Sequence, residues 1–496
     1  MKRFLLIALL TALACLPVMG AGQGGDAAAS SEPMAIELMR GIGNALLPDP
    51  ADDYILQGLN EALNIDLTLT GVAAEYERQV NVRIAGGNFP DAFAAPNRNY
   101  FLQYARDGVI MELEPYRSQL GNYLKMNPDA QAMGIVDGKW YSTATNLGIN
   151  YNGFYIRKDW LDALGLEIPK TLDDYLEVCK EFTFNDPDGN GKKDTYGYSG
   201  HGLGAFAPFF AAFGVGQYGQ TFAENGKIVF SHEDPRAKQA IAWLKEFAAS
   251  GVIDPNIIAI KKGTEVTQKQ AQGLVGLVWS SWPAMRKPEF VDMLTSVYPD
   301  SEWVLIDPPV GPNGDQNNGT FSTLGARIYY VYPATLEKNA ARRDKTLELI
   351  DYCASEPGYR LTSFGLEGTH YTVQSDGSLK AEDRLFQDGG YFWVYQFGGR
   401  KEVEYLMLKF AYAAEEIVKN GNASKIEVLD NGIDKPADYN HADATRYMQE
   451  ETLKFVYGQR PLSEYDDYVK TLNTTFGYSK YKNAATSQLK ALGIVK

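Results

Sequence analysis

Residues 185–197 read NDPDGNGKKDTYG, and their oxygen-bearing side chains have the spacing of a metal-binding loop. Four of them fall at positions 1, 3, 5 and 9 of a loop of the EF-hand type: Asp186, Asp188, Asn190 and Asp194. Lys192 can add its backbone carbonyl at position 7, and Gly191 at position 6 allows the sharp turn that such a loop needs. Ca²⁺ prefers several hard oxygen ligands from a loop that folds back on itself. The spacing therefore predicts a structural Ca²⁺ site.

The same loop departs from the EF-hand pattern at its end. Position 12 is Gly197, where an EF-hand places a glutamate that binds through both oxygens. A turn rich in Asp, Asn and Gly that holds no metal is therefore an open alternative. A catalytic cluster of acids is a weaker one, because no nucleophile and no metal site with an open position accompanies the loop.

Alternating strand and helix patterns would have to position this loop. Strand, helix, strand, helix and strand are predicted in that order at 34–42, 51–65, 66–72, 75–87 and 90–96. This order is typical of a parallel α/β sheet. Later helices are predicted at 170–182, 235–251 and 340–355, and later strands at 273–282 and 326–333. Thr171 and Asp174 stand in capping-box positions, and from residue 400 onward the pattern is mainly helical.

The length and charge of the chain limit its class. A chain of 496 residues is too long for one hydrophobic core, so two or three domains are expected. The formal net charge of −15 argues against nucleic acid as a partner, because binding phosphates requires clustered Lys and Arg. Cys179 and Cys353 fall on predicted amphipathic helices, where buried free thiols are favoured over a disulfide.

The N-terminus has the pattern of a secretory signal. Basic residues, an apolar run and small residues follow one another in MKRFLLIALLTALACLPVMG, which predicts a signal peptide over 1–20. Residues 21–33 are interpreted as a flexible leader. The stretch ALAC resembles a lipoprotein lipobox, so Cys15 is either lipidated, anchoring the chain to a membrane, or removed with the signal. A periplasmic or extracellular location is expected.

Several stretches together resemble the family 1 extracellular solute-binding proteins of bacterial ABC importers. They are GGNFPDAF (86–93), DGKWYSTATNLGINYNGFYIRKDWLDALGLEIPKTLDDY (137–175), FNDPDGNGKKDTYG (184–197), GLVGLVW (273–279) and GLEGTHYTV (365–373). The closest branch is that of the large oligosaccharide binders, which includes alginate-binding proteins. In those relatives an acidic residue directly after the last Asp completes the Ca²⁺ site. Here that residue is Thr195, so a hydroxyl or a water would have to serve.

The resemblance implies an α/β protein of the two-lobed periplasmic-binding-protein type, with a ligand cleft between discontinuous lobes that close by hinge bending. It places the first lobe at 34–145 and 300–370, and the second at 146–299 and 371–496. It also implies a function: the protein captures an oligosaccharide and delivers it to the permease subunits of an ABC transporter.

Candidate ligand residues follow from the chemistry of sugars. Sugars present apolar C–H faces and a rim of hydroxyls, so their sites combine aromatic rings with polar groups. Six aromatic residues stand in segments suited to line the cleft: Trp279, Trp282, Trp393, Tyr395, Trp140 and Tyr141. For each tryptophan, packing in the core or between the lobes is the alternative. Arg157 could meet an anionic group or pair with Asp159 or Asp162, and Asp91 could bind sugar hydroxyls or cap a turn.

A secreted glycoside hydrolase is the alternative function. Such an enzyme needs only two carboxylates on opposite sides of a cleft, and the chain has 62 acidic residues to choose from. The count of strand and helix units is too low for a barrel, and the stretches quoted above favour a binding protein. We therefore expect no catalytic residues. The charge, linkage and length of the sugar stay open.

Overall fold

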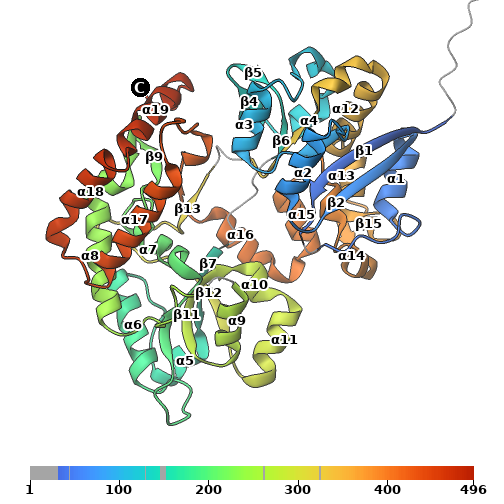
Figure 1. Ribbon diagram of the computed structural model, residues 1–496. Coiled ribbons are helices and arrows are strands. Elements are labelled where there is room, and N and C mark those ends of the chain that lie inside the picture. The colour runs from blue at the N-terminus through green and yellow to red at the C-terminus, as the bar shows by residue number, and fades with distance from the viewer. Residues whose placement is uncertain (1–31, 44, 129, 146–151, 261–262, 323–325) are drawn as a thin grey trace, which may run out of the picture.

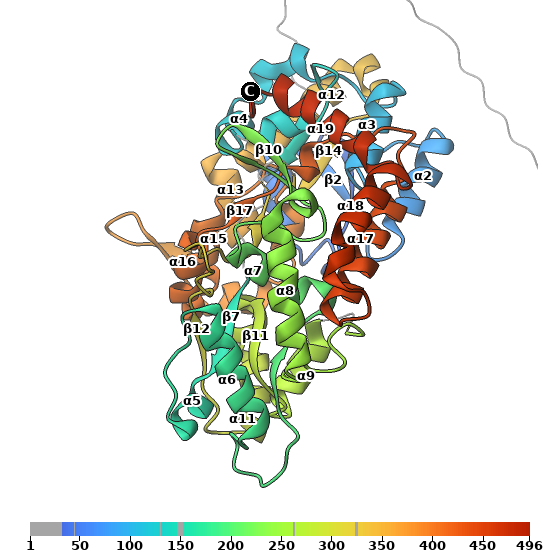
Figure 2. The ribbon, with the colours of Figure 1, turned by 90° about the vertical axis from the view of Figure 1, so that its left-hand side faces the viewer.

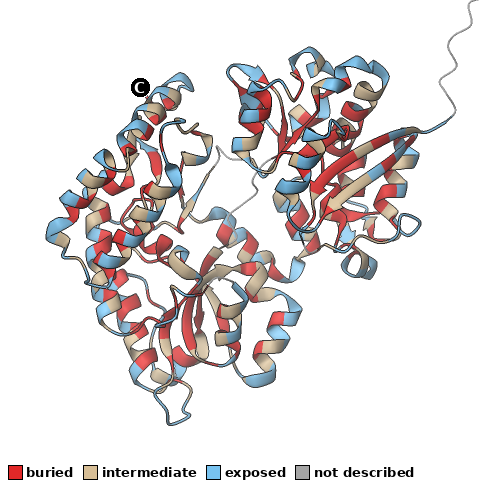
Figure 3. Cartoon of the chain, viewed as in Figure 1, coloured by how far each residue is buried: buried red, intermediate tan, exposed pale blue. Residues whose placement is uncertain are grey.

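Two lobes make up the protein, as two views of the computed structural model show (Figure 1, Figure 2). The structure describes residues 32–496 apart from 44, 129, 146–151, 261–262 and 323–325. Each lobe has its own β-sheet, and buried residues run through the centre of each lobe (Figure 3). The α/β class and the two-lobed architecture are therefore as predicted.

The sheet of the first lobe has the strand order β2-β1-β3-β14-β6. Its strands are β1 (Met34–Gly41), β2 (Ile65–Val72), β3 (Ala92–Ala94), β14 (Ile328–Val331) and β6 (Thr143–Thr145). β1 pairs in parallel with β2 and β3, whereas β14 runs antiparallel to β3 and β6. The predicted alternation near the N-terminus is confirmed, and two later segments complete the sheet.

Helices cover both faces of this sheet because the strand side chains alternate. Ile36 and Leu38 belong to one core cluster and Met39 to another. The first cluster includes α1 (Tyr54–Leu63), α12 (Ala340–Ala354) and α13 (Glu356–Phe364), and the other includes α2 (Tyr76–Ala85) and α3 (Arg98–Arg106). Asp53 starts α1, since its carboxylate accepts hydrogen bonds from the backbone N–H groups of Ile55 and Leu56.

The sheet of the second lobe has the order β12-β7-β11-β8. Its strands are β7 (Asn152–Arg157), β8 (Tyr196–Ser199), β11 (Val275–Ser281) and β12 (Trp303–Ile306). β11 is parallel to β8 and antiparallel to β7. The helix α6 (Leu172–Phe184) begins with the predicted capping box of Thr171 and Asp174. Trp279 thus lies toward the carboxyl end of β11, and the chain enters β8 at the opposite edge.

The remaining elements surround the two sheets. The first lobe adds α4 (Gly121–Met126), α14 (Asp383–Asp388), α15 (Glu402–Lys409) and the hairpins β4 (Ile135–Val136) with β5 (Lys139–Trp140) and β15 (Tyr371–Val373) with β16 (Leu379–Ala381). The second adds α5 (Lys158–Leu164), α7 (Ala207–Ala212), α8 (Pro235–Ala249), α9 (Gly263–Ala271), α10 (Trp282–Arg286), α11 (Pro288–Val297), α17 (His441–Val456), α18 (Tyr465–Thr474) and α19 (Tyr478–Ala491). It also holds the pairs β9 (Thr221–Glu224) with β10 (Lys227–Phe230) and β13 (Thr320–Phe321) with β17 (Ile426–Glu427).

Two predicted lobe boundaries are wrong. The return to the first lobe was placed at 300, but β12 pairs with β7 in the second sheet, so the chain returns only at β14. The departure was placed at 371, but α15 packs on α13 and β16 of the first lobe. The last crossing therefore runs through α16 (Ala414–Asn422), which lies between the lobes in Figure 1. The first crossing falls at 146–151, outside the described residues.

Both cysteines of the described part are free and buried, as predicted. Cys179 and Cys353 lie in different core clusters, and burial raises the pKa of both thiols. Cys15, the predicted signal peptide and the leader up to residue 31 lie outside the described residues. Within the described ranges, no helix is both long and apolar enough to span a bilayer.

Candidate functional site

A pocket of about 500 Å³ lies between the two lobes. Arg40 and Gly41 border it at the carboxyl end of β1, and residues 94–99 do so after β3. Because β14 is antiparallel to β3, its amino end, with Arg327, reaches the same edge. The second lobe contributes the loop 431–435. Open α/β sheets bind ligands at the carboxyl ends of their strands, so this pocket is the candidate binding site.

Trp393 lies next to this pocket because its ring contacts Arg40, which lines the pocket. The guanidinium of Arg40 lies 5.0 Å from the centre of the Trp393 ring. Its Nη1 donates to the hydroxyl of Tyr330 at 2.7 Å and to the carbonyl of Val394 at 2.9 Å. Trp393 belongs to the 3₁₀ turn Phe392–Tyr395 and is half-buried, so part of its ring faces solvent. A sugar contact by Trp393 stays a prediction that this position permits.

Trp279 is the second half-buried tryptophan among the candidates. Its Nε1 donates to the side-chain carbonyl of Asn318 at 2.9 Å. Its ring lies against Gly319, which has a φ of +73°, and a Cβ there would come within 2.9 Å of a ring carbon. The ring is thus held in one place while part of it stays exposed. Its role in sugar binding also stays a prediction.

Three other aromatic candidates are core residues, which corrects the prediction. Trp282 is fully buried, and its ring packs against Phe410 at 4.9 Å between centres. Tyr395 is buried and donates its hydroxyl to Asp53 at 2.5 Å. Trp140 is buried too, with its Nε1 donating to a backbone carbonyl at 2.7 Å. None of these rings faces solvent, so none can stack on a sugar in this conformation.

Tyr141, Arg157 and Asp91 do not join the pocket. Tyr141 is half-buried and packs against the core cluster that contains α3. Arg157 is buried and pairs with Asp159 at 2.7 Å, which confirms the ion-pair alternative. Because β7 is antiparallel to β11, Arg157 lies toward the amino end of β11, away from Trp279.

Asp91 is committed to the first lobe at the other edge of its sheet. It precedes β3, accepts a hydrogen bond from the backbone N–H of Glu37 at 2.8 Å and binds Arg342 through both oxygens. The pocket lies at the opposite end of β3. The predicted ligand roles of Arg157 and Asp91 are therefore wrong.

Residues 186–194 form a folded loop between α6 and β8, at the sheet edge opposite Trp279. The side-chain amide of Asn190 donates to Asp188 at 2.8 Å and to Asp194 at 3.3 Å. Gly191 has a φ of +77°, as its place in the turn predicts, and its N–H donates to Asp186 at 3.0 Å. Burial and the nearby Asp194 and Asp186 raise the pKa of Asp188. Oxygen ligands thus meet in this loop, with negative charge that a cation would relieve.

Thr195, at the end of this loop, makes a contact of its own with α6. Thr195 is buried, and its hydroxyl donates to the carbonyl of Phe182 at 2.7 Å, so it ties the loop to α6. Its role as a metal ligand stays a prediction. Over the part of the chain that the structure describes, no three side chains of His, Cys, Asp or Glu are grouped so as to hold a metal ion. A cation here would rely on Asp186, Asp188, Asn190 and Asp194 together with backbone carbonyls, such as that of Lys192, or water.

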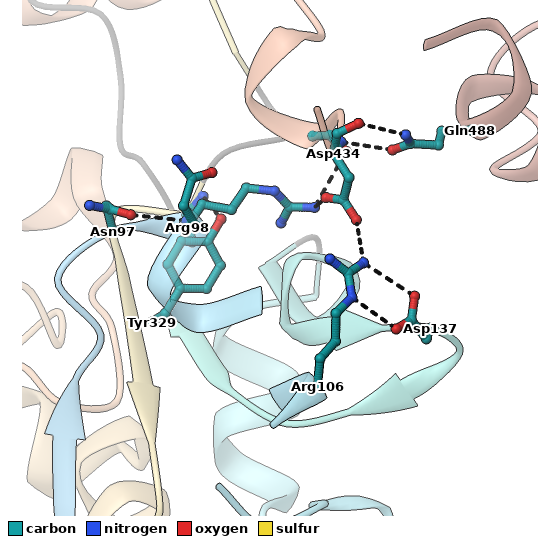
Figure 4. A network of polar contacts seen from close by, with 10 residues as sticks. Asn97, Arg98, Arg106, Asp137, Tyr329, Asp434 and Gln488 are labelled. Atoms are coloured by element: carbon teal, nitrogen blue, oxygen red, sulfur yellow. Dashed lines mark hydrogen bonds and ion pairs between the residues drawn. The ribbon is translucent and has the colours of Figure 1, made fainter. Parts of the chain in front are cut away.

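Two ion pairs join the lobes beside the pocket (Figure 4). Arg98 and Arg106, both on α3 of the first lobe, reach Asp434 of the second lobe at 2.9 and 3.1 Å. Gln488 holds the loop in place by hydrogen bonds of 2.8 and 2.9 Å to the backbone of Asp434. Both pairs are partly exposed to solvent, so each contributes at most about 1 kcal/mol. Together they favour the closed arrangement of the lobes.

Replacing Asp434 with alanine is expected to shift the ligand-free protein toward an open form, because both ion pairs between the lobes are lost. Small-angle X-ray scattering should show a larger radius of gyration than for the unchanged protein. Asp438→Ala is the matched control: it removes a pair with Lys480 at 2.7 Å that lies wholly within the second lobe. Identical scattering from the unchanged protein and both variants would show that Asp434 does not hold the lobes together.

Comparison with known proteins shows to which family the chain belongs. The family of bacterial extracellular solute-binding proteins matches residues 55–368, more than half of the chain. This protein belongs to that family. Its sequence is 27% identical over 347 residues to that of the polygalacturonan/rhamnogalacturonan-binding protein YtcQ of Bacillus subtilis (strain 168). The match covers 68% of each chain.

Two further relatives agree with this assignment. The solute-binding protein is 30% identical over 227 residues, 42% of each chain, to the fructooligosaccharide ABC transporter substrate-binding protein FusA of Streptococcus pneumoniae. The crystal structure of the alginate-binding protein AlgQ2 without calcium ion matches it with a TM-score of 0.67 at 18% identity, over 92% of this chain and 98% of that one. The structural likeness confirms the two-lobed fold.

The charged residues around the pocket of this solute-binding protein are ones that the sequence analysis missed: Arg40, Arg98, Arg327, Asp434 and Lys435. The sequence holds a signal for two of them, namely their position at the ends of predicted strands. Arg40 ends the apolar run of β1 and Arg98 follows β3, and both strands were predicted to be parallel. The other three come from distant segments, and only the folded chain brings them to the same edge.

Proposed function

We propose that this protein is the substrate-binding subunit of an ABC importer, that it captures an oligosaccharide between its lobes, and that it delivers the sugar to the permease. The pocket lined by both lobes at the carboxyl ends of β1 and β3 is the observation that carries the proposal. The names of YtcQ and FusA, which specify oligosaccharide or polysaccharide ligands, support sugar as the class. Half-buried Trp393 and Trp279, one in each lobe, suit the apolar faces of sugar rings.

Hinge closure would give this binding its effect on transport. A ligand that contacts both lobes binds the closed form more tightly than the open form, so it shifts the population toward the closed form. The ion pairs of Asp434 act in the same direction without a ligand. The permease would then recognise the closed, loaded protein.

We expect no hydrolysis of the bound sugar. A glycoside hydrolase needs two carboxyl groups that flank the scissile bond. Among the described residues that line the pocket there is no Asp or Glu.

Isothermal titration of the purified protein with a panel of oligosaccharides tests the proposal. We expect saturable binding of at least one oligosaccharide, and chromatography of the mixture should return the sugar intact. Release of shorter sugars would support the hydrolase instead. Binding of peptides in place of every sugar would overturn the sugar assignment.

We also propose that the loop 186–194 holds Ca²⁺ as a structural ion. The convergence of Asp188, Asn190 and Asp194 and the raised pKa of Asp188 support the proposal. A bound cation would supply positive charge where carboxylates crowd, and it would fix the turn between α6 and β8. The loop is remote from the pocket edge, so the ion would act on stability and not on the sugar.

Chelation is expected to lower the melting temperature, because an ion that binds only the folded state stabilises by RT ln(1 + [L]/Kd). Asp188→Ala should remove the difference between melting curves with EDTA and with added calcium. Asp188 is the better position to change, since Asp186 has a φ of 49°, where alanine would add strain. Asp466→Ala, at an exposed acid on α18, is the matched control and should keep the difference. The same melting temperature with EDTA and with calcium in the unchanged protein would contradict the proposal.

We further propose that the chain is exported and that Cys15 decides how it is retained. If Cys15 carries a lipid, the protein should partition into detergent and Cys15→Ser should release it into the aqueous phase. A soluble protein whose N-terminus lies beyond Cys15 would contradict the anchor while leaving export in place.

A further inference from the structure

The pocket between the lobes has a charge opposite to that of the chain. Sixteen described residues line it, of which four are Arg or Lys and none is Asp or Glu. In the whole chain, acidic residues outnumber Lys and Arg by 62 to 47. The positive charge of the pocket is therefore a local property that the overall composition does not explain.

Arg40 is the most deeply buried of these cations, at 3% exposure. Its hydrogen bonds go to neutral groups, namely the hydroxyl of Tyr330 and the carbonyls of Val394 and Gly41. Its Nη2 makes no hydrogen bond to any residue that the structure describes. Trp393 covers one face of the guanidinium. Among the described residues no carboxylate pairs with Arg40, and removing a cation from water without a counter-ion is unfavourable.

Arg327 of the first lobe and Lys435 of the second are also cations without a carboxylate partner among the described residues. Neither side chain forms an ion pair or a hydrogen bond with a described residue. Both residues line the pocket, and Arg327 is exposed to solvent there. The pocket walls still remove water from part of the Arg327 guanidinium, and this desolvation, with the positive charges of Arg400 and Arg40, lowers its pKa to about 10. Burial lowers the pKa of Lys435, and Arg98 acts in the same direction, whereas the nearby carboxylates of Asp430 and Asp434 oppose this shift. The cations repel one another across the pocket.

Arg98 does not cancel this excess. It shares the single carboxylate of Asp434 with Arg106, and its Nε is buried without a hydrogen-bond partner. Arg106 has a second partner in Asp137 at 3.1 Å, whereas Asp434 is the only carboxylate that Arg98 reaches among the described residues. An additional anion would find a free donor here as well as at Arg40 and Arg327.

We infer that this pocket binds the negative groups of an acidic oligosaccharide, one whose rings carry carboxylate or sulfate groups; the inference rests on the proposed function that the cleft takes up a sugar. The guanidinium groups offer paired N–H donors that match the two oxygens of such an anion. Arg40 and Arg327 of the first lobe and Lys435 of the second would hold the same ligand. The anion then closes the lobes, because only the closed form brings all three cations to it.

Titration with matched pairs of ligands tests the inference. We would use oligogalacturonides and alginate oligomers, each beside its fully methyl-esterified form, and a sulfated galactan oligomer beside its desulfated form. The acidic member should bind at least tenfold more tightly than its neutral partner, since charge-assisted hydrogen bonds are lost with the charge. Its affinity should also fall as NaCl is raised. The ligand pair with the larger ratio of acidic to neutral affinity shows whether the pocket prefers carboxylate or sulfate groups.

Arg327→Gln is the variant to compare, because the side chain is exposed and its loss should leave the fold intact. It should reduce the ratio of the two affinities, acidic member over neutral member, at least tenfold. Arg446→Gln removes the same charge from α17, at a side chain 66% exposed, and should change neither affinity.

The outcomes separate this inference from the proposed function. Neutral oligosaccharides that bind as tightly as acidic ones would overturn the inference and leave the transport role standing. An acid preference that Arg327→Gln does not change would overturn the assignment to this pocket. If no oligosaccharide binds, charged or neutral, the proposed function fails and the inference with it.

Discussion

Replacing Trp282 with alanine is expected to lower the free energy of unfolding by about 3–5 kcal/mol. Trp282 is 0% exposed, and its ring meets that of Phe410 at 62° and 4.9 Å between centres. It begins α10 in the second lobe, whereas Phe410 follows α15 of the first, so the missing ring leaves a cavity where the lobes are joined. Guanidinium denaturation followed by circular dichroism measures the loss.

Trp282→Phe is the control for this expectation. Phenylalanine refills much of the cavity, so the loss of stability should be clearly smaller. Sugar affinity of the folded fraction should stay close to that of the unchanged protein, because the ring faces no solvent. An unfolding midpoint unchanged in Trp282→Ala would show that the ring is not part of the core.

Replacing Trp279 with alanine is expected to weaken oligosaccharide binding at least tenfold. Burying such a ring against a sugar face contributes roughly 1–3 kcal/mol, and each ~1.4 kcal/mol is a factor of ten in affinity. Part of the ring faces solvent, so the loss of stability should be smaller than for Trp282→Ala. Titration with the sugar identified by the panel measures the effect, and quenching of tryptophan fluorescence on binding should decrease.

Trp243→Ala provides a matched control. Trp243 is also half-buried, but it lies on α8 and stacks on Phe247 at 4.9 Å, away from the pocket. Its loss should lower stability and leave the affinity unchanged. Equal affinity of the Trp279→Ala variant and the unchanged protein would remove Trp279 from the site.

Local patterns predicted the elements of the fold well. The helix 170–182 appears as α6 with its capping box, because Thr171 and Asp174 need only each other's backbone N–H groups. The loop glycine Gly191 has the positive φ that its place in the turn required. These features depend on residues a few positions apart, so the chain near them contains the whole cause. The parallel pairing of β1 with β2 and β3 spans more of the chain, but the alternation of strand and helix between them also predicts it.

The lobe boundaries could not be predicted in this way. β12 has the same apolar pattern as a strand of either sheet, and its pairing with β7 depends on residues about 150 positions away. The packing of α15 on α13 and β16 is likewise a long-range contact. A crossing between lobes leaves no periodicity of its own, so the predicted return to the first lobe at 300 and the predicted departure from it at 371 both fall too early in the chain.

The sequence alone predicts an α/β chain, a resemblance to the solute-binding family and a metal-type loop before a strand. Which side chains meet depends on the folded chain. Trp279 and Trp282 are three residues apart, yet one is half-exposed and the other joins the two lobes in the core. Arg40, Arg327 and Lys435 come from three distant segments and border one pocket. The reason is physical: periodicity follows from local backbone geometry, whereas burial and the meeting of charges follow from which surfaces pack together over hundreds of residues.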